Sequence, residues 1–167
     1  NRQVPSDAGY VAIVNSTGII VRDLTLKENG QGVLFAYTTN SVIEKVNVSN
    51  NEYGIYLLDS GNNFLRDNSM AGNLYNFRVG GLNLPHFIND IDTSNKVNGK
   101  PIYYLINQRN LIIDPSTFPN VGYLAVINST NITVRGLTLG NNGQGVTFAY
   151  TRNSAVENVN ASNNWFG

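Results

Sequence analysis

The sequence predicts an all-β fold, a parallel β-helix with a coil period near 22 positions. The first observation is a long internal repeat: residues 9–54 and 122–167, offset by 113 positions, are identical at 30 of 46 positions. The second is a shorter step of 22 positions, which relates Asn29, Asn51 and Asn73. A fixed short period is typical of stacked units that bury one continuous core. A β-sandwich with Asn-rich loops is the alternative fold, but it requires no such step.

Within one coil, apolar and polar residues alternate in three short runs, each closed by Asn, Gly, Asp or Ser. The apolar positions of the first such runs are Ile19, Val21, Leu24, Leu26, Val33 and Phe35. This period of two predicts three strands of three to five residues and three corners per coil. Because neighbouring strands lie about 4.8 Å apart, about seven coils predict a rod roughly 35 Å long.

Asparagine explains how the corners are built. It makes up 28 of the 167 residues, and its side chain tolerates the left-handed backbone of tight turns. When an Asn recurs at the same corner of successive coils, the amides can hydrogen-bond along the stack as a ladder. We therefore expect Asn ladders at the corners.

Residues 82–121 interrupt this short step. We expect one open-ended β-helix domain over residues 1–167, with coils at 9–81, an irregular insertion at 82–121 and the second long repeat at 122–167. The insertion is predicted to form enlarged coils or a lateral hairpin. Its expected strands, separated by Asn-Gly and Pro turns, are residues 87–92, 101–107 and 111–114.

Composition excludes several classes of function. The formal net charge is zero and 13% of residues are charged, whereas a nucleic-acid-binding protein needs a basic surface. No apolar run approaches the roughly 20 residues of a membrane span. Cysteine is absent, and His86 and Met70 are the only residues of their types. Soft-metal sites depend on such side chains, so we expect no metal and no cofactor.

Two segments resemble a known family. "NSTNITVRGLTLGNNGQGVTFAYTRNSAVENVNASNN" and "DIDTSNKVNGKPIYYLIN" resemble right-handed parallel β-helix repeats of the periplasmic copper-binding (NosD) type, and the related carbohydrate-binding and sugar-hydrolase repeats. Such repeats are abundant in S-layer-like surface proteins of methanogenic archaea. The resemblance implies right-handed coils and a place on an archaeal cell surface. The family name implies copper, but the chain has no Cys and only one His and one Met to hold it.

One cluster offers candidate catalytic residues. His86, Asp90 and Asp92 lie close together in the sequence, with Lys96 and Lys100 nearby, and paired carboxylates can hold a cation or perform acid–base chemistry. The alternative is that Asp92 opens a polar turn and His86 caps a loop. A carbohydrate-binding or polysaccharide-cleaving protein would combine this cluster with a groove lined by outward tyrosines, of which the candidates are Tyr56, Tyr103 and Tyr104.

Five N-x-Ser/Thr triplets are candidate glycosylation sites. They begin at Asn15, Asn47, Asn128, Asn131 and Asn160. Asn47 lies between the inward-facing Val46 and Val48, so its side chain is predicted to face solvent, where a glycan can be attached.

An apolar stripe on an outward strand face favours self-association. Leu34, Ala36, Tyr56 and Leu58 fall on the face that solvent should cover, and exposed apolar patches mark contact surfaces. A solenoid without caps also exposes strand edges at its ends. We therefore expect an extracellular structural module of an archaeal cell envelope, such as an S-layer, sheath or surface filament. Its expected partners are further copies in a homopolymer or lateral lattice, adjoining parts of a longer chain, and glycans.

Overall fold

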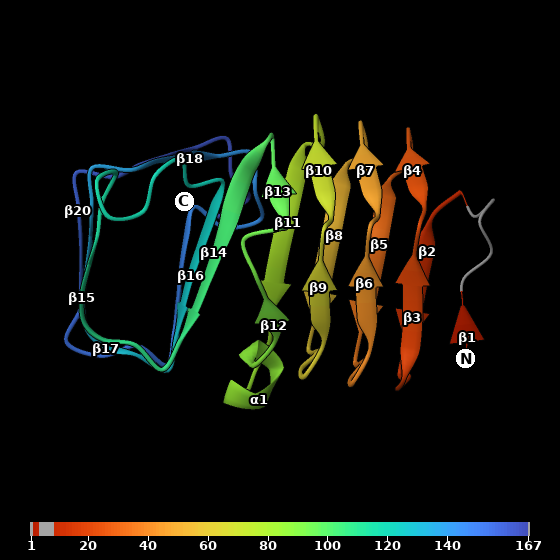
Figure 1. Cartoon of the computed structure of the whole chain (residues 1–167), viewed down its shortest axis with the longest axis horizontal. Helices are drawn as coiled ribbons and strands as arrows, with labels where there is room; N and C mark the ends of the chain where they lie inside the picture. Colours follow the sequence, from red (N-terminus) through yellow and green to blue (C-terminus); the bar gives the residue numbers. More distant parts are fainter. Residues whose placement is uncertain (1, 4–8, 167) are drawn as a thin grey trace.

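The computed structural model describes residues 2–3 and 9–166 and contains seven stacked coils of about 22 residues. The predicted all-β solenoid is therefore confirmed. The coils form two stacks, which differ in direction. Figure 1 shows the first stack from its side, with its strands in a row, and the second stack down its axis as a four-sided outline.

The first stack contains four coils. Its strands are β1 (Arg2–Gln3), β2 (Val11–Val14), β3 (Ile19–Arg22), β4 (Thr25–Lys27), β5 (Gln31–Ala36), β6 (Val42–Glu44), β7 (Asn47–Ser49), β8 (Tyr53–Leu58), β9 (Phe64–Arg66), β10 (Ser69–Ala71), β11 (Tyr75–Gly80), β12 (Asp90–Ile91) and β13 (Lys96–Val97). Val33 pairs with Ile55, and Ile55 with Phe77, in parallel register. Paired positions in successive coils are thus separated by the same 22-position step that relates the asparagines in the sequence.

The fourth coil is enlarged, as the break at residue 82 predicted. Phe64 pairs with Asp90, and Ser69 with Lys96, so both steps are longer than those between the preceding coils. The added residues include the short helix α1 (Leu84–Phe87). The expected strand at 87–92 was therefore wrong except at β12. Pro85 explains part of the difference, because proline donates no backbone hydrogen bond to a strand ladder and fits the first turn of a helix.

The second stack contains three coils. Its strands are β14 (Lys100–Ile106), β15 (Arg109–Ile113), β16 (Tyr123–Ile127), β17 (Thr130–Arg135), β18 (Thr138–Gly140), β19 (Val146–Ala149), β20 (Ala155–Glu157) and β21 (Asn160–Ser162). Ile102 pairs with Tyr123, and Leu124 pairs with Val146, so the first step is one position shorter than the second. The expected strands at 101–107 and 111–114 correspond to β14 and β15.

A hairpin turns the chain from one stack to the other. β13 and β14 are antiparallel, unlike every other strand pair in the described part of the chain, and Asn98 and Gly99 between them both have positive φ. An Asn-Gly pair suits the tight hairpin turn that reverses a strand. The seven coils therefore do not form the single rod of roughly 35 Å that the strand spacing predicted, because the solenoid has a corner after β13 (Figure 1).

Strand β16 lies between the two hydrophobic cores. Tyr123, Ala125 and Ile127 pack into the core of the first stack, whereas Leu124 and Val126 pack into that of the second. The outward face of the second stack thus closes the end of the first. This arrangement leaves all five residues of β16 buried.

The Asn ladders are confirmed. The backbone N–H of Asn29 donates to Asn51 Oδ1 at 2.9 Å, and that of Asn51 donates to Asn73 Oδ1, also at 2.9 Å. At another corner, Asn62 donates to Asn40, and both residues have positive φ. These amides satisfy backbone groups that would otherwise lose hydrogen bonds at each corner.

Candidate functional site

The predicted carboxylate pair is held by an arginine. Arg66 Nη2 lies 2.6 Å from Asp90 Oδ2, and Arg66 Nε lies 3.1 Å from Asp92 Oδ2. Asp92 also accepts hydrogen bonds from the backbone N–H (3.0 Å) and hydroxyl of Ser94. The two carboxylates do converge, but their partner is Arg66. This supports the alternative in which Asp92 opens a polar turn.

His86 has a different partner. Its Nδ1 lies 2.9 Å from Asp59 Oδ1, and the same carboxylate oxygen accepts the backbone N–H of Leu82 at 3.1 Å. Within the described residues, no three His, Cys, Asp or Glu side chains are grouped as a metal ion would require. The geometry therefore gives His86 a role in holding the loop of the enlarged coil.

All three candidate groove tyrosines are engaged in packing. Tyr103 meets Phe118 edge-to-face with ring centres 5.1 Å apart, and its hydroxyl donates to the carbonyl of Pro119 at 3.2 Å. The hydroxyl of buried Tyr104 donates to the carbonyl of Phe87 at 2.7 Å, and burial raises the pKa of Tyr104 far above its usual value. Tyr56 is covered by the guanidinium of Arg78, 4.6 Å from its ring centre. Tyr104 and Asp90 do line one hollow of about 280 Å³, but the Asp90 carboxylate there is paired with Arg66.

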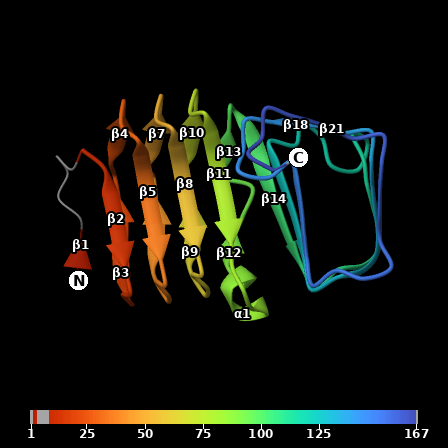
Figure 2. The ribbon, with the colours of Figure 1, turned by 180° about the vertical axis from the view of Figure 1, so that it is seen from behind.

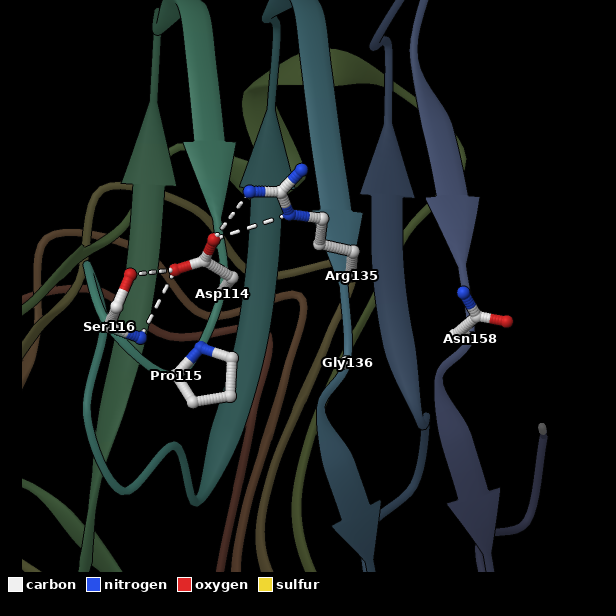
Figure 3. A pocket seen from close by; sticks show the side chains of 6 residues that line it. All are labelled: Asp114, Pro115, Ser116, Arg135, Gly136 and Asn158. Carbon is white, nitrogen blue, oxygen red and sulfur yellow. Dashed lines mark hydrogen bonds and ion pairs between the residues drawn. The ribbon is translucent and has the colours of Figure 1, made fainter.

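A larger hollow is formed around a structural carboxylate. This cavity of about 420 Å³ is lined by Asp114, Pro115, Ser116, Arg135, Gly136 and Asn158 (Figure 3). Asp114 accepts hydrogen bonds from the Ser116 hydroxyl (2.6 Å), Arg135 Nη2 (3.0 Å) and the Thr117 backbone N–H (3.1 Å). These donors, Ser116 foremost, hold the pKa of Asp114 well below its usual range. A carboxylate so stabilised as an anion is a poor general base at neutral pH.

All five sequon asparagines are exposed, but their amides differ. The Nδ2 atoms of Asn128 and Asn131 donate to Asn107 Oδ1 and Asn110 Oδ1, at 2.7 and 2.8 Å. Asn47 points outward between buried Val46 and Val48, as predicted. Because Nδ2 is the atom that carries an N-linked glycan, Asn47 is better placed for attachment than the two ladder residues. Glycosylation itself stays a prediction.

The apolar outer face belongs to the sheet of β2, β5, β8 and β11, which Figure 2 shows in front. Leu34 and Leu58 are half-buried, whereas Ala36 is buried. The sequence reasoning missed Tyr10, 60% exposed, and Val14, 59% exposed, on or beside β2. The same alternation of inward and outward residues would have identified them, since Val14 pairs with Ala36.

The last coil exposes part of its own core. Val146, Phe148, Val156, Val159 and Ala161 line an apolar hollow of about 380 Å³ at the end of the second stack. Val156 is 49% exposed, and it faces the position that a following coil would fill. The sequence predicted free strand edges at the ends of the solenoid; here part of the edge is paired, because the Gly145 N–H donates to the Phe166 carbonyl at 2.9 Å.

A polar groove runs along one corner of the second stack. It has a volume of about 330 Å³ and is lined by Asn107, Arg109, Asn128, Ser129, Thr130, Tyr150 and Arg152. Arg109 pairs with Thr130, and Thr130 with Arg152, so the two arginines are two coils apart in one column. Neither arginine forms an ion pair within the described part of the chain.

The donor set does not fit copper. Soft thiolate, thioether and imidazole ligands select this metal, yet the chain has no Cys, one Met and one His. Met70 is fully buried in the first core, and His86 is engaged with Asp59.

No helix in the described residues is both long enough and apolar enough to cross a membrane.

Comparison with known proteins places the chain in a family. Neither the curated proteins nor the solved structures include a match. The family described as "Periplasmic copper-binding protein (NosD)" matches residues 1–100, more than half of the chain. The β-solenoid agrees with the fold of that family, and the protein belongs to the NosD family.

Proposed function

We propose that this protein is a structural module outside the cytoplasm that associates with further copies of itself. The observation that carries the proposal is the apolar outer face of β2. Val14 is 59% exposed, whereas Ile127, its equivalent in the second copy of the repeat, is 0% exposed because it packs into the core of the first stack. Exposed apolar surface of a kind that is buried elsewhere in the same molecule favours association, because water is then excluded from it.

The place that best suits such a module is a cell envelope. The periplasmic description of the matching family supports a location outside the cytoplasm. The resemblance to archaeal surface repeats supports an S-layer, sheath or surface filament, and exposed sequons such as Asn47 suit a glycosylated surface. Backbone ladders, the aliphatic core and Asn ladders would supply mechanical strength along each stack.

Sedimentation velocity over a range of protein concentrations tests this function, with electron microscopy of the assembled particles. We expect the weight-average sedimentation coefficient to rise with concentration. Val14→Asp should lower association at least tenfold, because a carboxylate would be buried in an apolar contact. Ile112→Asp is the matched control, since Ile112 is a similarly exposed strand residue. A wild-type protein that stays monomeric at all concentrations would refute self-association.

The polar groove supports a second candidate function, the binding of an acidic saccharide. Arg109 and Arg152 lie two strand spacings apart, roughly 10 Å, and both can reach oxyanions bound over Thr130. The exposed ring of Tyr150 offers a face on which a sugar can pack, and the amides of Asn107 and Asn128 offer partners for hydroxyl groups. The first stack has Thr39 at the position equivalent to Arg152.

Titration calorimetry with trigalacturonic acid tests this candidate, with its neutral methyl ester and inorganic phosphate as comparison ligands. Arg152→Thr, which installs the residue of the first copy, should weaken binding of the acid about tenfold, as expected for loss of a charge-assisted hydrogen bond. Lys27→Gln removes the same charge elsewhere and should change little. Equal binding of the ester would rule out charge recognition, and equal binding of phosphate would rule out the saccharide.

A further inference from the structure

The enlarged fourth coil carries a loop that reaches the second stack. Residues 82–89, which include the helix α1, lie beside the corner in Figure 1. The hydroxyl of Tyr150, the residue that follows β19 in the second stack, donates to the carbonyl of Leu82 at 3.1 Å. The ring of Phe87 meets the Tyr150 ring edge-to-face, with ring centres 6.3 Å apart. A loop of the first stack therefore contacts a residue that lines the polar groove of the second.

The corner fixes this contact, because it joins the two stacks directly. Phe77 meets Tyr123 edge-to-face with ring centres 4.9 Å apart. The N–H of Gly143, the repeat equivalent of Gly30, donates to the Phe77 carbonyl at 2.9 Å. The loop of the first stack can thus act as a fixed wall for the groove in the second.

The loop is anchored at both of its ends. At its first residue, the backbone N–H of Leu82 donates to Asp59 Oδ1 at 3.1 Å, and His86 Nδ1 lies 2.9 Å from the same oxygen. The Asp59 side chain is only 7% exposed, so water cannot readily replace these partners. Towards the other end, the hydroxyl of buried Tyr104 donates to the Phe87 carbonyl. Asp59 and His86 thus determine where the Leu82 carbonyl lies.

Tyr150 depends on this support, because its backbone is in the left-handed region. Its φ is +56°, a conformation that costs free energy in a residue other than glycine. Its side chain is 48% exposed, so packing within the second stack does not hold the ring. The Leu82 carbonyl and the Phe87 ring supply two fixed contacts, one to the hydroxyl and one to the ring. These contacts hold the ring at the rim of the polar groove.

The first copy of the repeat contains the same tyrosine without the loop. Tyr37, the equivalent of Tyr150, has a φ of +51° and is 58% exposed. Its column runs from Asn15 to Asp59, and the coil after Asp59 is the one that carries the loop. Because coils on both sides leave the Tyr37 ring exposed, a tyrosine at this corner is open to solvent wherever it lies in a stack. What distinguishes Tyr150 is its contact with the loop.

We propose that Asp59 and His86 are positioning residues for the polar groove: through the loop at 82–89 they fix the Tyr150 ring where a sugar of an acidic saccharide packs. The proposal rests on the saccharide binding proposed above, and it names the part of the first stack on which that binding depends. The saccharide contacts Tyr150 and neither of the two positioning residues. The site is thus assembled by both stacks, although the residues that line it belong to the second.

The NMR signals of isotope-labelled tyrosine rings test the positioning without any ligand, and Tyr150→Phe and Tyr37→Phe assign the two signals. His86→Ala should shift the Tyr150 signals, because the ring then moves relative to Phe87, and should leave those of Tyr37 unchanged. His86→Asn keeps a donor near the place of Nδ1 and should restore the wild-type signals. Tyr150 signals that stay in place in His86→Ala would overturn the positioning role.

Titration calorimetry with trigalacturonic acid tests the consequence for the groove. His86→Ala should weaken binding about fivefold, as expected for the loss of one hydrogen bond, and His86→Asn should bind like wild type. Asp59→Gly removes the carboxylate while glycine tolerates the φ of +47° at this position, and it should weaken binding at least as much. Asp67→Gly is the matched control and should bind like wild type, because Asp67 is an exposed aspartate with a φ of +55°.

The outcomes separate the positioning from the function. If wild type binds no trigalacturonic acid while His86→Ala shifts the Tyr150 signals, saccharide binding is refuted and the hold on the ring stands. If wild type and His86→Ala bind equally well, the positioning role is overturned and saccharide binding stands. Equal weakening by Asp59→Gly and Asp67→Gly would also overturn it, since the added glycine alone would explain the loss.

The Tyr37 signals report whether the first stack of each variant is intact. If they also move in His86→Ala, the loop supports the whole stack, and Tyr150→Phe decides, because it removes only the hydrogen bond to Leu82. Binding weakened about fivefold in Tyr150→Phe would support the proposal, and binding equal to that of wild type would overturn it.

Discussion

Two copies of one sequence repeat occupy different environments in this molecule. Tyr10 precedes β2 and Val14 ends it, and this strand has one face in solvent, whereas Tyr123 and Ile127, their equivalents, lie in a strand buried on both sides. The strands differ little in sequence. What differs is the solenoid end that packs against the second copy. The comparison teaches that an outward apolar face of this repeat is a capping surface, and that its exposure depends on whether an end is present.

Removing the capping ring should show this difference most strongly. Tyr123→Ala should lower the free energy of unfolding by about 3–5 kcal/mol, the usual cost of truncating a buried aromatic side chain. Tyr10→Ala, at the equivalent exposed position, should change it by no more than about 0.5 kcal/mol. Urea denaturation of monomeric protein measures both. If both substitutions lowered the unfolding free energy equally, the packing of Tyr123 at the corner would stabilise the fold no more than an exposed ring does.

The Asn ladder offers a second comparison between copies. Asn51 accepts the backbone N–H of Asn29 and donates to Leu26, Ser49 and Asn73. Its equivalent Asn164, in the last coil, accepts from Asn142 and donates only to Leu139 among the described residues.

We therefore expect Asn51→Ala to cost about 2–3 kcal/mol of unfolding free energy and Asn164→Ala about 1 kcal/mol, because each unsatisfied buried partner costs free energy. Denaturation of the two variants under the same conditions measures the difference. A larger loss for Asn164→Ala would contradict the ladder as the source of stability.

The glycine pair sharpens the comparison at the corner itself. Gly143→Ala should lower stability by about 1–3 kcal/mol, since the new Cβ would overlap Arg78 and the core would be overpacked. Gly30→Ala meets open space and should be neutral or stabilise slightly by restricting the unfolded chain. Thermal unfolding of the two variants measures the difference.

The stacking and the ladders could be predicted from the sequence because both depend on a fixed spacing. Asn29, Asn51 and Asn73 recur at one constant step, and each contacts the next. The corner could not be predicted in this way. Phe77 and Tyr123 meet across an insertion, and nothing in the period relates their positions. The candidate site was only partly predictable. Asp90 and Asp92 are close in the sequence, but their partner Arg66 lies on the preceding coil, which is separated from theirs by more than the regular 22 positions.

The unfolding free energy at alkaline pH tests the burial of Tyr123 selectively. Burial raises the pKa of Tyr123 to about 12, although its hydrogen bond with Thr147 acts in the opposite direction. The folded state thus holds this proton more tightly than the unfolded chain, in which a tyrosine has a pKa of about 10. The stabilisation of the folded state that this difference in pKa provides is complete below pH 10, and it is lost as the pH rises from 10 towards 12. One such group contributes a slope of up to about 1.4 kcal/mol per pH unit. Tyr123→Phe removes the ionisable group, so its unfolding free energy should fall less steeply than that of wild type between pH 10 and 11. If the unfolding free energies of wild type and Tyr123→Phe, measured by urea denaturation, fell equally steeply with pH, Tyr123 would have a similar pKa in the folded and the unfolded chain. That result would contradict the burial of its hydroxyl group between the two cores.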